Sequence, residues 1–373
     1  MKKQSEPAPE WATANDPKRV LILSADAGFG HKAAANAIAA AFREDFAGQA
    51  EVMVVNPLDH TEAPRLLVSA QDDYDRMIQQ SPDLYRAGYG ASDGAIPAGI
   101  AEQALTLMLY SVLRDILGTH QPDVVITTYP LYQAPLAALQ ALSRRGTPFL
   151  TVVTDLATVH RLWFHENAEL CLVPTREVAQ KALDSGLRPD RVEITGLPVN
   201  PQLARPVDKA ALREKLGWRS DRVVAVFTGS KRVKKLEPIA QIFNHSALPL
   251  ELAIVTGGDE ELRRRFEAVE WHLPGHVYGY VDNMYEMLQA ADFIVCKAGG
   301  LIVSEALAAG LPLLIAEALP GQETGNVAFV LGGHAGLFVK DASEALVQVF
   351  HWVDNDAAEL KATAARARAL GRP

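Results

Sequence analysis

Three groups of residues in this 373-residue sequence have types and spacings suited to chemistry. The first is the glycine-containing turn SADAGFGH at 24–31, which leads into an alanine-rich helical pattern. A histidine in the first turn of a helix is disfavoured as a cation because the helix dipole repels positive charge. It therefore stays neutral and can accept a proton. We interpret His31 as a general base, against the alternative of a structural or surface histidine.

The other two groups have the chemistry of a nucleotide-sugar pocket. CKAGGLIVSEAL at 296–307 runs from a strand through a glycine turn into a helix, whose N-terminus favours an anion. One turn inside, Glu305 can accept two ribose hydroxyls; the alternative is a solvated glutamate. In PGQETGN at 320–326, Gln322, Glu323 and Asn326 offer directional groups for sugar hydroxyls. Alone, that run is also an ordinary helix cap.

These groups need a framework, and apolar runs of strand length alternate with helical patterns along the chain. This alternation predicts parallel sheets covered on both faces, in which ligands bind at the carboxyl ends of the strands. The strand pattern stops between 61 and 117, and a Pro/Gly/Asn stretch at 196–206 indicates a linker between two α/β halves. The predicted strands are 19–24, 51–56, 123–128, 149–154, 170–173, 192–195, 222–228, 251–256, 276–278, 292–296 and 312–316.

Composition excludes several classes of protein. The hydrophobic fraction of 49% and charged fraction of 22% are typical of globular chains, and the net charge of −9 argues against nucleic acid as a partner. The two cysteines lie far apart, so a reducing compartment fits. No apolar run reaches the roughly 18–20 residues of a membrane span. We expect a cytoplasmic protein, or one on a membrane surface, with a disordered leader at 1–18.

The first glycine turn also has an alternative interpretation as a dinucleotide fingerprint, Gly28-x-Gly30-x-x-Ala33. The acidic residue expected after the second strand is absent, because Asn56-Pro57 stands there. This absence weakens the hypothesis of an NAD-dependent oxidoreductase.

Four segments together resemble the monogalactosyldiacylglycerol synthase and processive diacylglycerol glucosyltransferase family. They are SADAGFGHKAAANAI at 24–38, VTDLATVHRLWFHENAELCLVPTREV at 153–178, GYVDNMYEMLQAADFIVCKAGGLIVSEALAAGLPLLI at 279–315 and PGQETGNVAFV at 320–330. The resemblance implies an α/β fold of the GT-B type, with two Rossmann-like domains across a cleft. We expect an acceptor domain at 19–198, a donor domain at 199–345, and C-terminal helices at 346–373 that cap either domain or return to the first.

The resemblance also implies an activity: inverting transfer of galactose or glucose from a UDP-sugar to diacylglycerol, without a metal or other cofactor. His31 matches the catalytic-region histidine, with Asp155 as its orienter or as an alternative base. Acceptor contacts fall on Gly28, Phe29, Gly30, Tyr85 and Trp163. Donor contacts fall on Gly229, Ser230, Lys231, Asn283, Met284, Ala298, Gly299, Gly300, Leu301, Glu305, Gln322, Glu323 and Asn326.

The sequence departs from the family at the phosphate loop after the first strand of the second domain. TGSKRVKK at 228–235 has one glycine, so its basic residues either neutralise diphosphate or form a solvated or membrane-facing patch. The acidic pairs at 73/75 and 354/356 are interpreted as solvated, and His160 with His165 lacks a third zinc ligand.

A lipid acceptor requires contact with a membrane. Apolar residues in the interrupted region at 61–117 and the aromatics of Leu162-Trp163-Phe164, which we expect to be exposed, could lie in the interface. We expect a peripheral protein on the inner face of the cell membrane, with anionic phospholipid as a further partner. Alternative functions are a polyprenyl-lipid N-acetylglucosaminyltransferase or a UDP-sugar epimerase of the same fold, and a non-catalytic nucleotide- or lipid-binding module.

Overall fold

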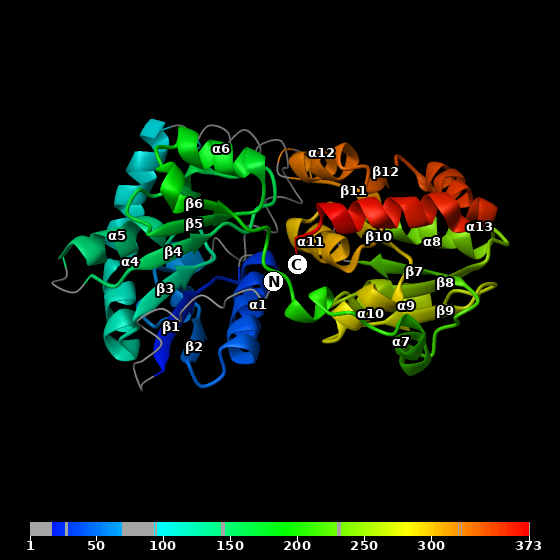
Figure 1. The fold of residues 1–373 in the computed structure, drawn as a ribbon, viewed down its shortest axis with the longest axis horizontal. Coiled ribbons are helices and arrows are strands. Elements are labelled where there is room, and N and C mark those ends of the chain that lie inside the picture. Colours follow the sequence, from blue (N-terminus) through cyan, green and yellow to red (C-terminus); the bar gives the residue numbers. More distant parts are fainter. Residues whose placement is uncertain are drawn as a thin grey trace, which may run out of the picture.

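The fold consists of two α/β halves, each built on a parallel six-stranded sheet (Figure 1). The computed structural model describes residues 17–26, 29–68, 93, 95–142, 146–229, 233–319, 321 and 323–372. The first sheet has the order β2-β1-β3-β4-β5-β6. Its strands are β1 (Lys18–Leu23), β2 (Ala50–Val55), β3 (Val124–Thr127), β4 (Phe149–Val152), β5 (Leu170–Val173) and β6 (Val192–Ile194).

Helices cover both faces of this sheet, which explains why its strands are predominantly apolar. Val20 and Ile22 of β1 pack against α1, whereas Leu21 and Leu23 pack against α4 and α5. The helical elements of this half are α1 (Phe29–Asp45), η2 (Pro57–Asp59), α4 (Ala95–His120), α5 (Gln133–Leu142), η3 (Arg161–Trp163), α6 (Arg176–Asp184) and η4 (Pro189–Arg191).

The second sheet has the order β12-β11-β10-β7-β8-β9. Alternate residues of its strands again enter two cores, as Val224 and Phe227 of β7 show. The strands are β7 (Val223–Thr228), β8 (Leu250–Val255), β9 (Gly275–Tyr278), β10 (Phe293–Lys297), β11 (Leu313–Glu317) and β12 (Gly336–Phe338). The helical elements are η5 (Pro201–Ala204), α7 (Lys209–Leu216), α8 (Leu236–Asn244), α9 (Glu260–Glu267), α10 (Met284–Ala290), α11 (Gly300–Ala309), α12 (Thr324–Gly332) and α13 (Ala342–Leu370).

Local signals explain where several of these helices begin and end. Thr175 caps α6 by accepting a hydrogen bond from the Val178 amide. Gly310 ends α11 in the left-handed conformation at φ +71°, which a glycine adopts without a steric penalty. The helix α13 is kinked at 354–357 and packs on α8 and α11 of the second half, and beyond it Arg372 donates to the Ile194 carbonyl at 3.1 Å.

The eleven strands predicted from the sequence are confirmed within two residues of their ends, and β12 was missed. Helices α11 and α12 of the second half face the first half (Figure 1). Among the described helices, none is long and apolar enough to cross a membrane. The fold thus brings the carboxyl edges of two parallel sheets to a common boundary.

Candidate active site

The first wall of the site lies at the carboxyl edge of the first sheet. His31 sits in the first turn of α1, which follows β1. Thr128 directly follows β3, while Thr154 and Asp155 come shortly after β4. Because β1, β3 and β4 are neighbours in the sheet, these four side chains meet although up to 124 positions separate them in the sequence.

Two oxygens hold the Nδ1 atom of His31. The Thr128 carbonyl lies 2.9 Å from Nδ1, and the Thr154 hydroxyl lies 2.7 Å from it. The ring also has an edge contact with Tyr129, with ring centroids 4.9 Å apart. Burial lowers the pKa of His31 below its usual range, against the opposing effects of the Asp155 carboxylate and the Thr128 carbonyl. The imidazole is therefore neutral at pH 7 and able to accept a proton.

Asp155 contacts the indole of Trp163 instead of the Nδ1 atom of His31. Trp163 Nε1 donates to Asp155 Oδ2 at 2.8 Å. Burial raises the pKa of Asp155, whereas the nearby His31 and the indole hydrogen bond lower it. The expectation that Trp163 and Phe164 are exposed is wrong: they are 0% and 5% exposed, in a core with α6. Trp163 thus contacts the site from the buried core, through its indole N–H.

The second wall lies at the carboxyl edge of the second sheet. The residues that were predicted to contact the donor, and that the structure describes, lie along this edge. Gly229 directly follows β7, and a side chain there would collide with Leu262 and Leu236 at 2.8 and 3.0 Å. Asn283 and Met284 begin α10 after β9. Ala298 and Gly299 lead from β10 into Gly300 and Leu301, the first residues of α11. Glu323 and Asn326 follow β11.

Glu305 is a partly buried carboxyl group within α11. Burial raises its pKa from the usual value of 4.5 to about 7. In the part of the chain that the structure describes, its carboxylate makes no hydrogen bond or ion pair. A carboxylate in this state gains from a ligand that supplies hydroxyl donors.

Glu323 and Asn326 already have protein partners. Glu323 forms a buried ion pair with Lys297, which the sequence analysis did not single out, and also accepts from the Leu319 amide at 2.8 Å. Asn326 Nδ2 donates to the Ala298 carbonyl at 2.9 Å, and its buried Oδ1 has no hydrogen-bond partner among the described residues. Lys297 and Glu323 therefore link the end of β10 to the start of α12, where the predicted donor residues lie.

The two walls touch through two glycines. A Cβ at Gly300 would lie 3.5 Å from Leu156 and 3.6 Å from the Thr154 carbonyl. A Cβ at Gly325 would lie 2.8 Å from Ala157 Cβ and 2.9 Å from Thr158 Oγ1. The segment 154–158, which carries Asp155, is thus pressed against the N-terminal ends of α11 and α12.

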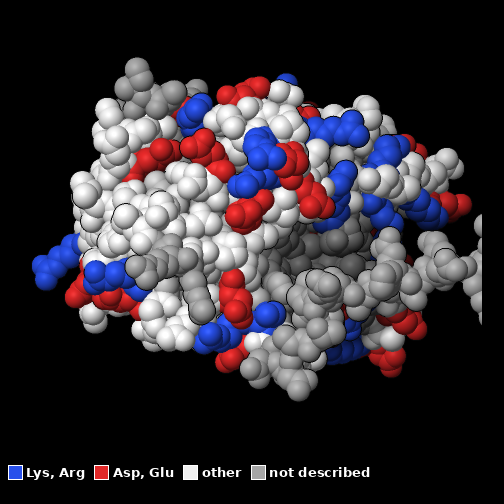
Figure 2. Space-filling view, turned by 60° about the vertical axis from the view of Figure 1, so that its left-hand side comes forward, with Lys and Arg blue, Asp and Glu red and all other residues white. Residues whose placement is uncertain are grey.

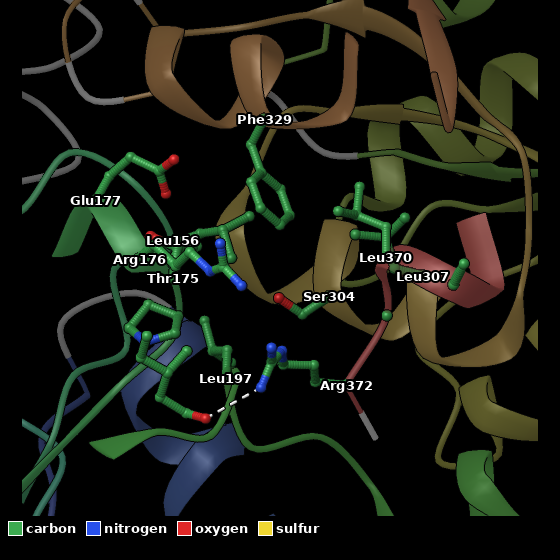
Figure 3. A pocket seen from close by; sticks show the side chains of 15 residues that line it. Leu156, Thr175, Arg176, Glu177, Leu197, Ser304, Leu307, Phe329, Leu370 and Arg372 are labelled. Carbon is green, nitrogen blue, oxygen red and sulfur yellow. Dashed lines mark hydrogen bonds between the residues drawn. The ribbon is translucent and has the colours of Figure 1, made fainter. Parts of the chain in front are cut away.

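The surface is hollowed near the boundary between the halves. Figure 2 shows a hollow in the surface between the halves, with charged side chains gathered around its rim. A second cavity, of about 230 Å³, lies between the halves and is lined by Leu156, Ser304 and Phe329. Arg176 and Arg372 extend into it from opposite sides (Figure 3). None of the predicted site residues lines this cavity, so it is separate from the predicted donor site.

Some predicted residues are not placed. Gly28, Tyr85, Ser230, Lys231 and Gln322 lie outside the described residues, as does the side chain of Phe29. The backbone of Phe29 and Gly30 forms the start of α1.

The basic loop at 228–235 is described only at its two ends. Lys235 points toward β12, where its Nζ lies 3.4 Å from the Val339 carbonyl and 5.5 Å from the Phe338 ring centroid. Its ammonium group therefore contacts β12 and the residue that follows it.

The sequence predicts that the acidic pairs and the two histidines His160 and His165 are not metal ligands. Asp354 and Asp356 are exposed as predicted, although they sit in the kink of α13 and not in regular helix. His160 and His165 accept hydrogen bonds from backbone amides through Nδ1 at 3.2 Å each, so both serve as turn caps. The acidic pair at 73/75 lies outside the described residues.

Known proteins resemble this chain over nearly its whole length. Residues 31–199 match the family model "Monogalactosyldiacylglycerol (MGDG) synthase", and residues 223–348 match "Glycosyltransferase family 28 C-terminal domain". A probable chloroplastic monogalactosyldiacylglycerol synthase from Glycine max is 32% identical over 369 residues, covering 96% of this chain and 69% of the relative. The corresponding synthase from Spinacia oleracea is 32% identical over 376 residues, covering 96% and 70%.

Among solved structures, the crystal structure of MurG from Acinetobacter baumannii superposes with a TM-score of 0.58. It is 17% identical to this chain and covers 96% of each. This similarity and the two parallel sheets confirm the predicted GT-B-type fold.

Proposed function

This chain belongs to the monogalactosyldiacylglycerol synthase family, and from that premise we propose how its two walls transfer a hexose from a UDP-sugar to diacylglycerol. The observation that carries the proposal is the contact between Gly300, which opens α11, and the segment 154–156, whose Thr154 holds His31. A neutral base and an anion-binding helix end are thereby placed side by side.

Proton transfer falls to His31. Its unprotonated nitrogen takes the proton from the free hydroxyl of diacylglycerol as that oxygen attacks the anomeric carbon of the sugar. The bond from the anomeric carbon to the phosphate oxygen breaks on the opposite face, and UDP leaves with the electron pair. The Asp155 carboxylate stabilises the imidazolium that forms, because it already acts to raise the pKa of His31. The anomeric configuration is inverted.

The leaving UDP is held by the second wall. The backbone N–H groups at the start of α11 and the dipole of this helix receive the diphosphate. Glu305 receives the ribose hydroxyls, which supply the donors that its buried carboxylate lacks. Glu323, which is held by its ion pair with Lys297, is assigned to the hexose.

The transferred hexose is galactose in our proposal, since both relatives are named for that sugar. The test is incubation of the protein with diacylglycerol vesicles and either UDP-galactose or UDP-glucose. Formation of galactolipid supports the proposal, glucolipid alone moves it to the other hexose, and no glycolipid with either donor contradicts it.

Replacement of the base tests the mechanism within the same assay. His31→Ala should abolish transfer and leave UDP affinity intact. The matched control is His351→Ala, an exposed histidine on α13 that should leave transfer unchanged. Transfer by His31→Ala at the wild-type rate would remove His31 from the reaction.

Access to the lipid is assigned to an exposed face of α4. Ile100 and Leu107 are 65% and 85% exposed, and they lie seven residues apart, on one side of the helix. Leu66, which belongs to the same interrupted region at 61–117, is 70% exposed. Apolar side chains in this arrangement can enter the boundary between headgroups and acyl chains. We propose peripheral attachment to the membrane that supplies diacylglycerol.

A double variant tests this attachment. Ile100→Asp with Leu107→Asp should reduce sedimentation with vesicles. The control pair, Val347→Asp with Phe350→Asp, alters similarly exposed residues on α13 and should have no effect. Equal sedimentation of the two double variants would contradict the assignment. Comparing zwitterionic with anionic vesicles tests the further expectation that anionic phospholipid contributes.

We also propose that transfer is independent of metal ions, because backbone amides can stabilise the diphosphate. Within the described ranges, no group of three or more His, Cys, Asp or Glu is arranged to hold a metal. Activity that survives exhaustive EDTA treatment agrees with this proposal, and activity restored only by a divalent cation overturns it.

A further inference from the structure

We propose that Thr154 is a positioning residue, whose hydroxyl and the Thr128 carbonyl together fix His31 in the tautomer that carries its proton on Nδ1. The Nε2 atom is thereby left as the proton acceptor. This inference rests on the proposed role of His31 in transfer. It assigns the orientation of the base to a hydroxyl and a main-chain carbonyl, and not to the neighbouring carboxylate.

The Thr128 carbonyl decides the tautomer. A carbonyl oxygen can only accept a hydrogen bond, and it lies 2.9 Å from His31 Nδ1. If Nδ1 carried a lone pair, two acceptors would face each other at this distance. With a proton on Nδ1, the N–H is shared between the Thr128 carbonyl and Thr154 Oγ1, at 2.7 Å. The Thr154 hydroxyl can then donate to the same carbonyl at 3.5 Å, so all three atoms have compatible roles.

The threonines are rigid enough to position a ring. Thr154 is 5% exposed and Thr128 is fully buried. The Thr128 amide donates to the Leu23 carbonyl at 3.0 Å, and its hydroxyl donates to the His31 main-chain carbonyl at 3.1 Å. Thr128 therefore contacts His31 at both the ring and the backbone, and Thr154 completes the hold from the next strand.

Asp155 does not occupy the orienting position. Its Oδ2 accepts from Trp163 Nε1 at 2.8 Å, and no hydrogen bond joins its carboxylate to His31 in the described part of the chain. The carboxylate acts on His31 through its charge. The other titratable group against the ring is the Tyr129 phenol, while His160 acts on Asp155.

The experiment compares three threonine variants. Thr154→Val removes the hydroxyl and keeps the shape, and Thr154→Ser keeps the hydroxyl. Thr151→Val is the matched control. Thr151 lies on β4, three residues before Thr154, and is buried as Thr154 is, but its Oγ1 makes no hydrogen bond with any described residue. We expect kcat/KM to fall about fivefold to tenfold in Thr154→Val, the factor that one ordinary hydrogen bond supplies. Thr154→Ser and Thr151→Val should stay within about twofold of the wild type, since neither loses a hydrogen bond to His31.

The pH profile separates positioning from loss of structure. A hydroxyl that accepts from Nδ1–H stabilises the imidazolium, so its removal lowers the pKa of His31. The acid limb of kcat/KM should therefore move to lower pH in Thr154→Val and stay in place in both other variants. An unchanged acid limb with unchanged kcat/KM in Thr154→Val overturns the proposal.

Nitrogen NMR of protein labelled at histidine tests the tautomer without turnover. The His31→Ala spectrum assigns the resonances, and we expect wild-type Nδ1 to be protonated and Nε2 unprotonated at neutral pH. A protonated Nε2 with an unprotonated Nδ1 overturns the inference even in an active enzyme. Conversely, the expected tautomer in a protein without transferase activity would contradict the proposed function alone.

Discussion

The indole Nε1 of Trp163 donates to Oδ2 of Asp155 at 2.8 Å, linking a fully buried aromatic residue to the carboxylate beside the base. Trp163 also lies against His31, with ring centroids 5.9 Å apart. One side chain thus limits the positions of both groups. Because the hydrogen bond lowers the pKa of Asp155, it helps to keep this buried carboxyl group ionised.

Trp163→Phe should therefore impair catalysis more than folding. The substitution keeps an aromatic ring in the core and raises the pKa of Asp155, so less carboxylate remains to stabilise the imidazolium of His31. We expect kcat to fall about tenfold, with a loss of about 1 kcal/mol in the free energy of unfolding. The control is Trp218→Phe, which removes a similar 2.9 Å hydrogen bond to Tyr278 within the second half. Equal kcat values in the two variants would argue against a role for the indole.

Donor affinity should depend on the ionisation of Glu305. Its pKa of about 7 means that a proton competes with ribose hydroxyls as the pH falls below neutrality. UDP should thus bind more weakly at pH 6 than at pH 8, as measured by calorimetry. In Glu305→Gln the affinity at pH 8 should fall about tenfold, as expected for hydrogen bonds to a charged acceptor. If the pH dependence came only from protonation of the UDP phosphates, wild type and Glu305→Gln would show the same pH dependence of UDP affinity. That result would exclude Glu305 from the ribose site.

The same substitution should stabilise the protein without ligand. The folded pKa of Glu305 lies above its usual 4.5, so the folded state holds the proton more tightly than the unfolded state. Its contribution to stability is therefore lost as the pH rises from about 4.5 to about 7. Glu305→Gln should raise the free energy of unfolding at pH 8 by at most about 3 kcal/mol, and should leave it nearly unchanged at pH 4. Urea denaturation at the two pH values measures the difference, and destabilisation at pH 8 would contradict it.

Gly325→Ala should separate the two walls. Its Cβ would meet Ala157 and Thr158 across the boundary at 2.8 and 2.9 Å, closer than real side chains approach. We expect kcat/KM to fall about tenfold, as displacement of catalytic groups by a fraction of an ångström commonly does. The control on the same helix is Gly332→Ala, where a Cβ meets nothing within 4 Å. Identical kcat/KM values in Gly325→Ala and Gly332→Ala would refute this contact.

Lys297→Met should leave the carboxylate of Glu323 buried and without its cation. Breaking a buried pair in this way destabilises proteins by about 3 kcal/mol or more, which urea denaturation would detect. The affinity for UDP-hexose should fall, and that for UDP should not, because Glu323 is assigned to the sugar. Arg188→Met, which breaks a surface pair with Asp190, should change neither stability nor affinity. Equal weakening of UDP and UDP-hexose in Lys297→Met would place Glu323 away from the hexose.

Much of the framework could be predicted because most strands are rich in apolar residues, as sheets covered on both faces require. β12 was missed because its three residues, Gly336–Phe338, begin with a glycine and include no β-branched residue, whereas the equally short β6 contains Val192 and Ile194. The aromatics Trp163 and Phe164 are expected at the surface because a lipid acceptor requires apolar contact with a membrane. Their burial is decided by packing on α6, which the local sequence does not reveal.

In the candidate site, too, some residues could be predicted from local sequence and others could not. His31 and Glu305 stand out because glycine turns precede them, and the structure places both at facing sheet edges. Thr154 and Lys297 give no such signal, since each looks like an ordinary strand-end residue. Their importance lies in partners 123 and 26 positions away, His31 and Glu323. Only the strand order brings those partners together.

The contact of Gly300 and Gly325 with the segment 154–158 has a consequence for water. The residue that orients the base lies in the segment on which the second half rests. Any separation of the two halves would remove this contact and leave Thr154 without a neighbour from α11. We therefore expect His31 to be best aligned while the halves touch. An activated sugar would then react with a lipid acceptor in the assembled site more readily than with water in an open one.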